Sequence, residues 1–246
     1  EDSTFTHLGG AALDLRVGAQ GIGVIGNRFR DVSGHGIQVG ETDYFVDRPS
    51  LAADRLDRFD ISNNVIEDVA VEYLDNVGVL VTYASNVSIL HNEIAHLPYT
   101  GISVGWGWGT DSYARHNVIA FNRVRDVMRT LNDGGAIYTL SSQPDSLIYA
   151  NHVDGVVHMN GAIYLDEGTR DYTMARNVVE RSPRWLHLWT DTIRDDVVVD
   201  NFSDTDGMKN EGVNITLDNN AVDLDEWPPA AREVIDGAGL EPAYRN

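Results

Sequence analysis

Two stretches of almost the same text decide the fold: "GAIYTL" at residues 135–140 and "GAIYLDEG" at residues 161–168. The second stretch carries two acids near its end, Asp166 and Glu167, that the first lacks. In both stretches inward and outward positions alternate with a period of two, which is typical of a β-strand. A strand that recurs with nearly the same sequence indicates a repeat architecture.

The same text recurs along most of the chain. Similar strand-like segments begin at residues 36 ("GIQVGE"), 78 ("GVLVTY"), 101 ("GISVGW") and 185 ("WLHLWT"). Between these segments an asparagine follows an apolar run, at Asn27, Asn64, Asn92, Asn122, Asn151, Asn177 and Asn201. Because asparagine tolerates a left-handed backbone and bonds neighbouring peptide groups, it suits a turn that is repeated in stacked coils.

These repeats predict an all-β fold, a single-stranded right-handed parallel β-helix of seven or eight coils. A β-sandwich or barrel also has short, regularly spaced strands, but its fold does not require the same sequence pattern to recur from strand to strand. We expect the β-helix over residues 1–224, with further native coils before residue 1. Residues 225–246 should form a C-terminal cap segment, in which "PPAAREVIDGAG" (228–239) predicts a helix over the last coil. The charged segment 41–60 predicts a surface loop with a helical turn.

The composition limits the possible partners. The chain has 246 residues, a net charge of −20 and no cysteine. Because such an acidic surface repels phosphate backbones and anionic lipids, we expect neither nucleic acid nor a membrane as partner. Without cysteine there are no disulfides, thiolate metal sites or cysteine nucleophiles. The sequence demands no metal or other cofactor, although acidic loops are compatible with a structural Ca²⁺.

The strand alternation assigns side chains to faces. It sends Ile163 and Leu165 into the coil and leaves Tyr164 and Asp166 outside. Applied to every coil, it predicts one outward column of Gln38, Leu80, Ser103, Tyr138, Tyr164 and His187. It predicts a second column of Gly40, Thr82, Gly105, Leu140, Asp166 and Trp189. The loops at the strand ends carry Trp106, Trp108, Gln143, Glu167 and Asp191.

This outward face has the residue types of a carbohydrate site. Aromatic rings offer flat apolar plates to sugars, while acids and histidine serve hydrogen bonding and proton transfer. We therefore predict a groove that binds a polysaccharide or oligosaccharide through Tyr138, Tyr164, Trp106, Trp108, Gln143 and Trp189. Two simpler interpretations stay open. The tyrosines can form a purely stabilising ladder, and Asp166 can be a turn residue that bonds its own backbone.

At these residues the sequence resembles a known family. "RDVMRTLNDGGAIYTLSSQP" (125–144) followed by "GAIYLDEGT" (161–169) is similar to β-helix glycoside hydrolases related to glycoside hydrolase family 141. "GISVGWGWG" (101–109) and "AGLEPAYR" (238–245) resemble further parts of that pattern. The resemblance implies cleavage of glycosidic bonds in plant polysaccharides, of the fucoside or xylan type. It also implies that Asp133 of "DGG" and Asp166 of "LDEG" are the catalytic carboxylates.

The strand register alone leaves the carboxylate pair open. Asp133 precedes its strand and Asp166 ends the next, which in extended chain separates them by roughly 20 Å. Glycoside hydrolysis needs carboxyl groups within about 10 Å of each other. Either the Gly134–Gly135 turn folds Asp133 back over the groove, or another pair acts. Glu167 is then the first substitute, with His187 as acid or orienting partner.

Two other functions remain as alternatives. A polysaccharide lyase that cleaves uronans needs a cation against the uronate and a basic residue or tyrosine as base. Arg170 and Arg184 could serve there, and the only lysine is Lys209. A non-catalytic carbohydrate-binding β-helix needs the aromatic groove and no special carboxyl pair. For any of these functions we expect a secreted or periplasmic protein.

Overall fold

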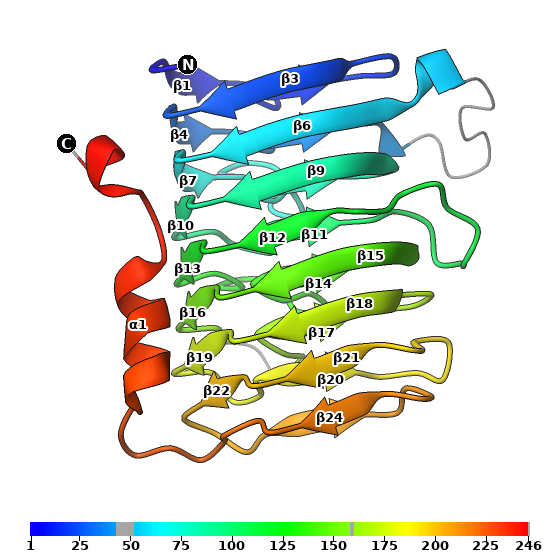
Figure 1. The fold of residues 1–246 in the computed structure, drawn as a ribbon. Coiled ribbons are helices and arrows are strands. Elements are labelled where there is room, and N and C mark those ends of the chain that lie inside the picture. Colours follow the sequence, from blue (N-terminus) through cyan, green and yellow to red (C-terminus); the bar gives the residue numbers. More distant parts are fainter. Residues whose placement is uncertain (43–51, 158–159, 246) are drawn as a thin grey trace.

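The chain winds into three parallel β-sheets stacked coil upon coil, as seen in a computed structural model that describes residues 1–42, 52–157 and 160–245 (Figure 1). Each sheet has eight strands, and every strand pairs in parallel with the equivalent strand of the next coil. The predicted right-handed parallel β-helix is confirmed, and the described residues form eight coils.

The three sheets run along the whole stack. Sheet A contains β1 (Thr4–Leu8), β4 (Arg28–Val32), β7 (Val65–Val69), β10 (Glu93–Ala95), β13 (Arg123–Arg125), β16 (His152–Asp154), β19 (Val178–Glu180) and β22 (Phe202–Ser203). Sheet B contains β2 (Leu13–Leu15), β5 (Ile37–Val39), β8 (Val79–Val81), β11 (Ile102–Val104), β14 (Ile137–Thr139), β17 (Ile163–Leu165), β20 (Leu186–Leu188) and β23 (Met208–Asn210). Sheet C contains β3 (Gln20–Ile25), β6 (Leu56–Ser62), β9 (Ala84–Leu90), β12 (Val118–Ala120), β15 (Ser142–Tyr149), β18 (Arg170–Ala175), β21 (Val197–Val199) and β24 (Thr216–Asp218).

The core fills the inside of the coils. The inward residues Ile163 and Leu165 are fully buried, as are Ile102 and Leu186 at equivalent places in other coils. They belong to one hydrophobic cluster that draws on all three sheets. The alternation of the strands therefore assigns the inner face correctly.

A ladder of asparagines marks the corner between sheets C and A. In each rung the backbone N–H and the side-chain Nδ2 of one asparagine donate to the Oδ1 of the next, as Asn92 does to Asn122 at 3.0 and 2.9 Å. The ladder contains the seven predicted residues and an eighth, Asn220, which accepts from Asn201. Each rung satisfies buried peptide groups that the sharp turn leaves without a strand partner.

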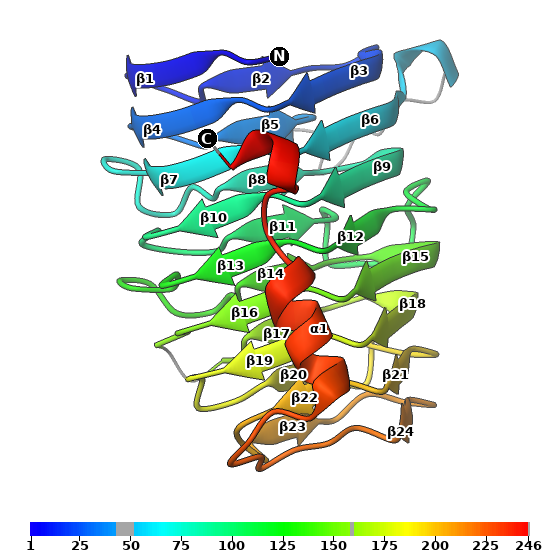
Figure 2. The same ribbon diagram turned by 60° about the vertical axis from the view of Figure 1, so that its left-hand side comes forward.

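The predicted C-terminal helix forms as α1 (Pro229–Gly237). Its buried residues Ala231 and Val234 pack against Ala150 and Val178. Figures 1 and 2 show that α1 runs along the flank of the stack and not across the edge of the last coil, where β24 is exposed along its length. The expected position over the last coil is thus corrected, because the apolar stripe of the helix finds its partners at the corner that precedes sheet A.

The loop expected at 41–60 is described in part, and its end is corrected, because residues 56–60 belong to the paired strand β6. A short 3-10 helix, η2 (Ala52–Asp54), provides the predicted helical turn, and residues 43–51 lie outside the described residues. No helix in the described part of the chain is long and apolar enough to span a membrane.

Candidate functional site

The outer face of sheet B carries the predicted column of side chains. Ser103, Tyr138, Tyr164 and His187 occupy paired positions of β11, β14, β17 and β20. Tyr138 and Tyr164 form a small apolar cluster with Leu140 that is separate from the core inside the coils. Both tyrosines are nevertheless buried, at 8% and 2% exposure, because side chains and loops cover this face.

A single carboxylate organises these aromatic residues. Asp166, directly after β17, accepts hydrogen bonds from the Tyr138 hydroxyl, from the Tyr164 hydroxyl at 3.2 Å and from the indole Nε1 of Trp189. The three donors come from three successive coils, and Asp166 is only 5% exposed. We call Tyr138, Tyr164, Asp166, His187 and Trp189 the acid–aromatic face. Asp166 is more than a turn residue, since three aromatic donors fix its orientation.

Asp133 reaches the same region by a turn of the backbone. Its φ of 62° is left-handed, and its backbone oxygen accepts a 2.7 Å bond from the Tyr99 hydroxyl. Its Oδ1 accepts from the Asn160 amide at 3.3 Å. Although the residue is largely exposed, partial burial of its carboxyl raises the pKa of Asp133, and the charge of Asp166 raises it further. Asp133 thus lies close enough to Asp166 for the Asp166 charge to act on its carboxyl, while the pairing of the two as catalytic residues stays a prediction.

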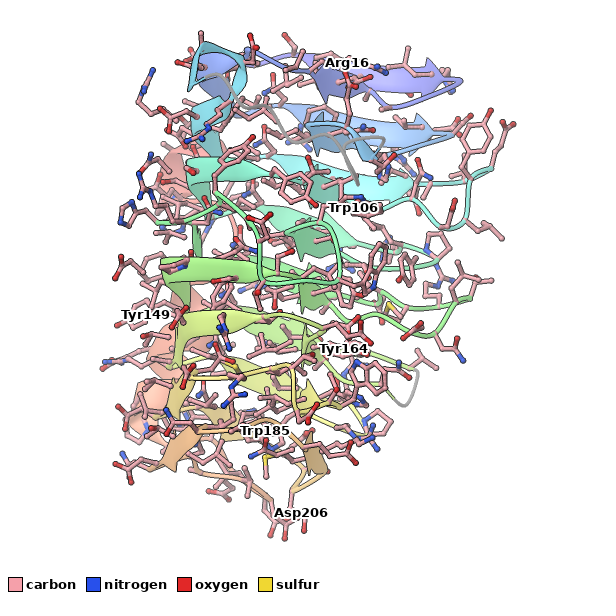
Figure 3. The ribbon with its side chains drawn as sticks, turned by 90° about the vertical axis from the view of Figure 1, so that its right-hand side faces the viewer. Arg16, Trp106, Tyr149, Tyr164, Trp185 and Asp206 are labelled. Carbon is pink, nitrogen blue, oxygen red and sulfur yellow. The ribbon has the colours of Figure 1, made fainter. Side chains whose placement is uncertain are left out.

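A groove of about 580 Å³ lies beside these residues. Its lining includes Asp133, Tyr138, Tyr99, Trp106 and Trp108. The rings of Trp106 and Trp108 meet edge to face at 5.4 Å, and Trp108 is 45% exposed. Figure 3 shows Trp106 and Tyr164 on one side of the stack, with Tyr149 on the other. The groove therefore has the exposed aromatic walls and the acid that a sugar site requires.

A glycine shapes one wall of this groove. Gly105 follows β11 with a φ of 104°, and a Cβ at this place would lie 1.9 Å from the backbone oxygen of Leu140. Only glycine fits here, and its conformation leads the chain from the strand into the loop that carries both tryptophans.

The environment of the face keeps its hydroxyls protonated. Burial raises the pKa of Tyr138 and of Tyr164 above the usual range, and the Asp166 charge adds to this effect. Burial also raises the pKa of Tyr99 to about 12. All three therefore act as neutral donors near pH 7, which is the form that Asp166 needs in order to accept from two of them.

His187 is a buried member of the acid–aromatic face. Its ring lies 4.5 Å from that of Tyr164, and only 7% of the residue is exposed. Its Nδ1 lies 2.7 Å from Arg184 Nη1 and 2.5 Å from the backbone oxygen of Asn160. Burial lowers the pKa of His187, and the Arg184 charge contributes in the same direction. This placement suits an orienting partner of Tyr164.

Two predicted site residues lie elsewhere. Gln143 is fully buried; its Nε2 donates to the backbone oxygens of Val104 and Leu140, and its Oε1 accepts from Asn117. The predicted substrate contact of Gln143 is corrected to a role inside the coil, where its amide satisfies the turn after the strand. The side chain of Glu167 has no hydrogen bond or ion pair with the acid–aromatic face among the described residues.

Sequence reasoning missed three residues of this site. Tyr99 and Asn160 contact Asp133 from loops, where the strand period gives no direction for a side chain. His35 lines the groove, and its Nδ1 accepts from the backbone N–H of Val77 at 2.9 Å. Burial lowers the pKa of His35 to about 4, so it is neutral near pH 7. A signal for His35 existed, since "SGHGIQ" (33–38) runs into β5 of sheet B.

The site has no evident metal ligands. Over the ranges 1–42, 52–157 and 160–245 no three His, Cys, Asp or Glu residues cluster in a way that could hold a metal ion. The expectation on Ca²⁺ stays a prediction.

Comparison with known proteins gives two likenesses. The family described as "Right handed beta helix region" matches residues 1–179. A solved structure named "Glycoside hydrolase" is similar with a TM-score of 0.77 at 28% sequence identity, over 98% of this chain and 38% of that chain. This chain thus spans little more than a third of the length of that protein. No curated protein matches the chain.

Proposed function

The chain belongs to the right-handed β-helix family, and from its acid–aromatic face we propose that it is a glycoside hydrolase acting on a polysaccharide. The observation that carries this proposal is a pair of carboxyl groups in unequal environments. Asp166 accepts three hydrogen bonds, whereas burial and the Asp166 charge raise the pKa of Asp133. The likeness to a structure named glycoside hydrolase supports the same activity.

The unequal environments suggest the roles of the two acids. A carboxyl whose pKa is raised keeps its proton longer and can donate it to the oxygen of the leaving group. This is the role we propose for Asp133, which lines the groove. Asp166, with its donors in place, is proposed as the base or nucleophile on the other side of the bond.

The remaining residues bind and orient in this proposal. Trp106 and Trp108 stack on sugar rings at the groove wall, and Trp189, 37% exposed, adds a further plate beside Asp166. Tyr138 and Tyr164 position Asp166, His187 positions Tyr164, and none of the three touches a reacting atom. The resemblance to glycoside hydrolase family 141 further suggests a substrate with a fucoside- or xylan-type linkage. We also propose that the protein acts outside the cytoplasm.

The test is a digestion screen with product analysis. The wild type, Asp133→Asn and Asp166→Asn would be incubated with fucosylated glycan, xylan and uronan, and both reducing ends and unsaturated products would be followed. Asp191→Asn, at an exposed loop acid, is the matched control. We expect reducing ends at the full rate from the wild type and the control, and only residual release from Asp133→Asn and Asp166→Asn. Unsaturated product would instead identify a lyase, and sugar binding without any product would identify a binding scaffold.

The raised pKa of Asp133 adds a pH test. An acid catalyst acts only while protonated, so the rate should fall as the pH rises through the pKa of Asp133. In Asp133→Asn this alkaline fall should be absent from the residual activity. An unchanged alkaline limb would assign the acid to another group.

A further inference from the structure

A second concavity, of about 520 Å³, lies on sheet C, away from the acid–aromatic face. It is found where β6, β9 and β12 begin, on the right-hand side of Figure 1. Its lining includes Arg55, Arg58, Arg115, Asp57, Tyr113 and Asn86. Three arginines against one aspartate make this pocket cationic on a chain of net charge −20.

The single aspartate compensates only one of these arginines. Asp57 pairs with Arg58 through Oδ2 and accepts from the Asn86 amide through Oδ1 at 2.6 Å. Neither Arg55 nor Arg115 has an ion pair with any residue that the structure describes. Two guanidinium groups in this concave site thus have no counter-charge among the described residues, and guanidinium groups of this kind bind carboxylate and sulfate groups.

Arg55 is held in place for such a role. Its guanidinium carbon lies 4.9 Å from the centroid of the Tyr113 ring, so stacking fixes its position. Its Nε is buried and has no hydrogen-bond partner within the part of the chain that the structure describes. Buried donors are nearly always satisfied in folded proteins, so this N–H indicates a missing acceptor.

The loop that frames the pocket is itself anchored. Ser85 donates to the backbone oxygen of Tyr113 at 2.8 Å, and the Asn86 N–H donates to the backbone oxygen of Arg115 at 3.0 Å. The same loop carries Trp106 and Trp108, which line the groove of the proposed active site. One polysaccharide chain long enough to cross this loop could therefore occupy both sites.

We propose that this sheet C pocket binds an anionic sugar unit of the polysaccharide, through a carboxylate or sulfate group held by Arg55 and Arg115. The identity of the polymer rests on the proposed function, while the anion site rests on the arginines alone. The acidic chain repels anions at long range. We therefore expect the site to select anions that contact both guanidinium groups, because only these gain enough binding free energy to outweigh the repulsion.

The test measures binding separately from hydrolysis. Affinity of the intact chain for polygalacturonate, dextran sulfate and neutral dextran would be measured by isothermal titration calorimetry at low and high salt. The variants are Arg55→Gln, Arg115→Gln and their combination, with Arg129→Gln as a control of equal charge change at an exposed arginine outside the pocket. Melting temperatures would confirm that every variant folds. Asp166→Asn would show whether binding persists when the proposed catalytic carboxylate is removed.

The expected result is salt-sensitive binding of an anionic polymer, with at least about tenfold weaker affinity in the double variant. Arg129→Gln and Asp166→Asn should bind like the wild type. Preference for polygalacturonate would identify a carboxylate ligand, and preference for dextran sulfate a sulfate ester. Equal binding by the wild type and the folded double variant, or no anion binding at all, would overturn the proposal. Binding that depends on the arginines, without hydrolysis of any glycan, would leave this inference standing and reject the hydrolase.

Discussion

The asparagine ladder and the acid–aromatic face are both buried polar sites on the same stack, yet they are built in opposite ways. Asn122 accepts from Asn92 and donates to Asn151, so every rung has the same residue and the same bonds. Asp166 accepts from two tyrosines and a tryptophan of three different coils. A polar residue that recurs in every coil satisfies the hydrogen bonds of the backbone there. A buried polar residue that occurs in one coil alone indicates a function specific to that coil.

This contrast separates fold from function within a repeat protein. Buried polar groups must be hydrogen-bonded wherever they occur, so burial and bonding alone do not identify a site. The departure from the repeat does, because stability alone would favour the same residue in each coil. If the contrast is correct, changes in the ladder should act on stability and changes in the face on activity.

The largest stability effect should come from Asn122→Ala. The substitution removes the acceptor of the Asn92 N–H and Nδ2 and the donor to the Ile89 oxygen, all in a fully buried site. We expect the free energy of unfolding to fall by about 3–5 kcal/mol, measured by chemical denaturation. Asn132→Ala, at an exposed asparagine outside the ladder, should change it by less than about 0.5 kcal/mol. Equal effects of the two substitutions would break the contrast.

A somewhat smaller effect, dependent on pH, should come from Asp196→Asn. Asp196 is buried and accepts from the Tyr172 N–H at 2.9 Å, while its second oxygen has no partner. Burial raises the pKa of Asp196 to about 7 from an ordinary 3.8, and the charges of Asp171 and Asp195 add to this. The folded state therefore favours the protonated form, and its stabilisation is lost as the pH rises from about 4 through about 7.

Asparagine keeps the acceptor without the charge. The difference in unfolding free energy between Asp196→Asn and the wild type should therefore grow in favour of the variant, by about 2–4 kcal/mol between pH 4 and pH 8. Taking the difference cancels the contributions of the other carboxylates. A difference that stays constant over this range would show that Asp196 has the same pKa in the folded and the unfolded chain, so that burial does not raise it.

The next effect, on catalysis, should follow Tyr138→Phe. It removes one donor to Asp166 and keeps the ring, so we expect kcat to fall about 10- to 100-fold with KM little changed. Tyr164→Phe removes the 3.2 Å donor and should cost less, about threefold to tenfold in kcat. A change in melting temperature without a change in kcat would make both tyrosines a structural ladder, as in the simpler interpretation of the sequence.

The smallest effect should be that of Trp108→Ala at the rim of the groove. Loss of one exposed stacking surface should raise KM about threefold to tenfold and leave kcat nearly unchanged. Tyr73→Ala, at a residue 51% exposed that does not line the groove, is the matched control and should leave both constants unchanged. A loss of kcat in Trp108→Ala would place this ring closer to the reaction.

The sequence predicts the fold well because the repeat is local and dense. Period-two alternation and the recurring asparagine determine strands, faces and register, and seven of the eight ladder residues follow from spacing. Asn220 is not predicted as a ladder residue, because it follows Asn201 by only 19 residues. The position of α1 is not predicted because an apolar stripe in the sequence does not name its packing partners, and only the folded structure shows that they are Ala150 and Val178.

The site is predicted only where it lies on strands. Tyr138, Tyr164 and His187 follow from the register, whereas Tyr99, Asn160 and the return of Asp133 depend on loop geometry. Gln143 is misplaced because it is expected in a loop, whereas it lies near the start of β15, after the left-handed turn at Ser141, with its side chain buried. The period thus predicts faces up to the end of a strand and no further.

The central claim is that Asp166 serves chemistry and not stability. The most direct measurement compares Asp166→Asn with the wild type in two assays, release of reducing ends from the best substrate of the screen and the melting temperature. We expect activity to fall by about a thousandfold or more while the variant stays folded. Undiminished activity in a folded Asp166→Asn variant would contradict this account, because the acid–aromatic face would then be part of the scaffold.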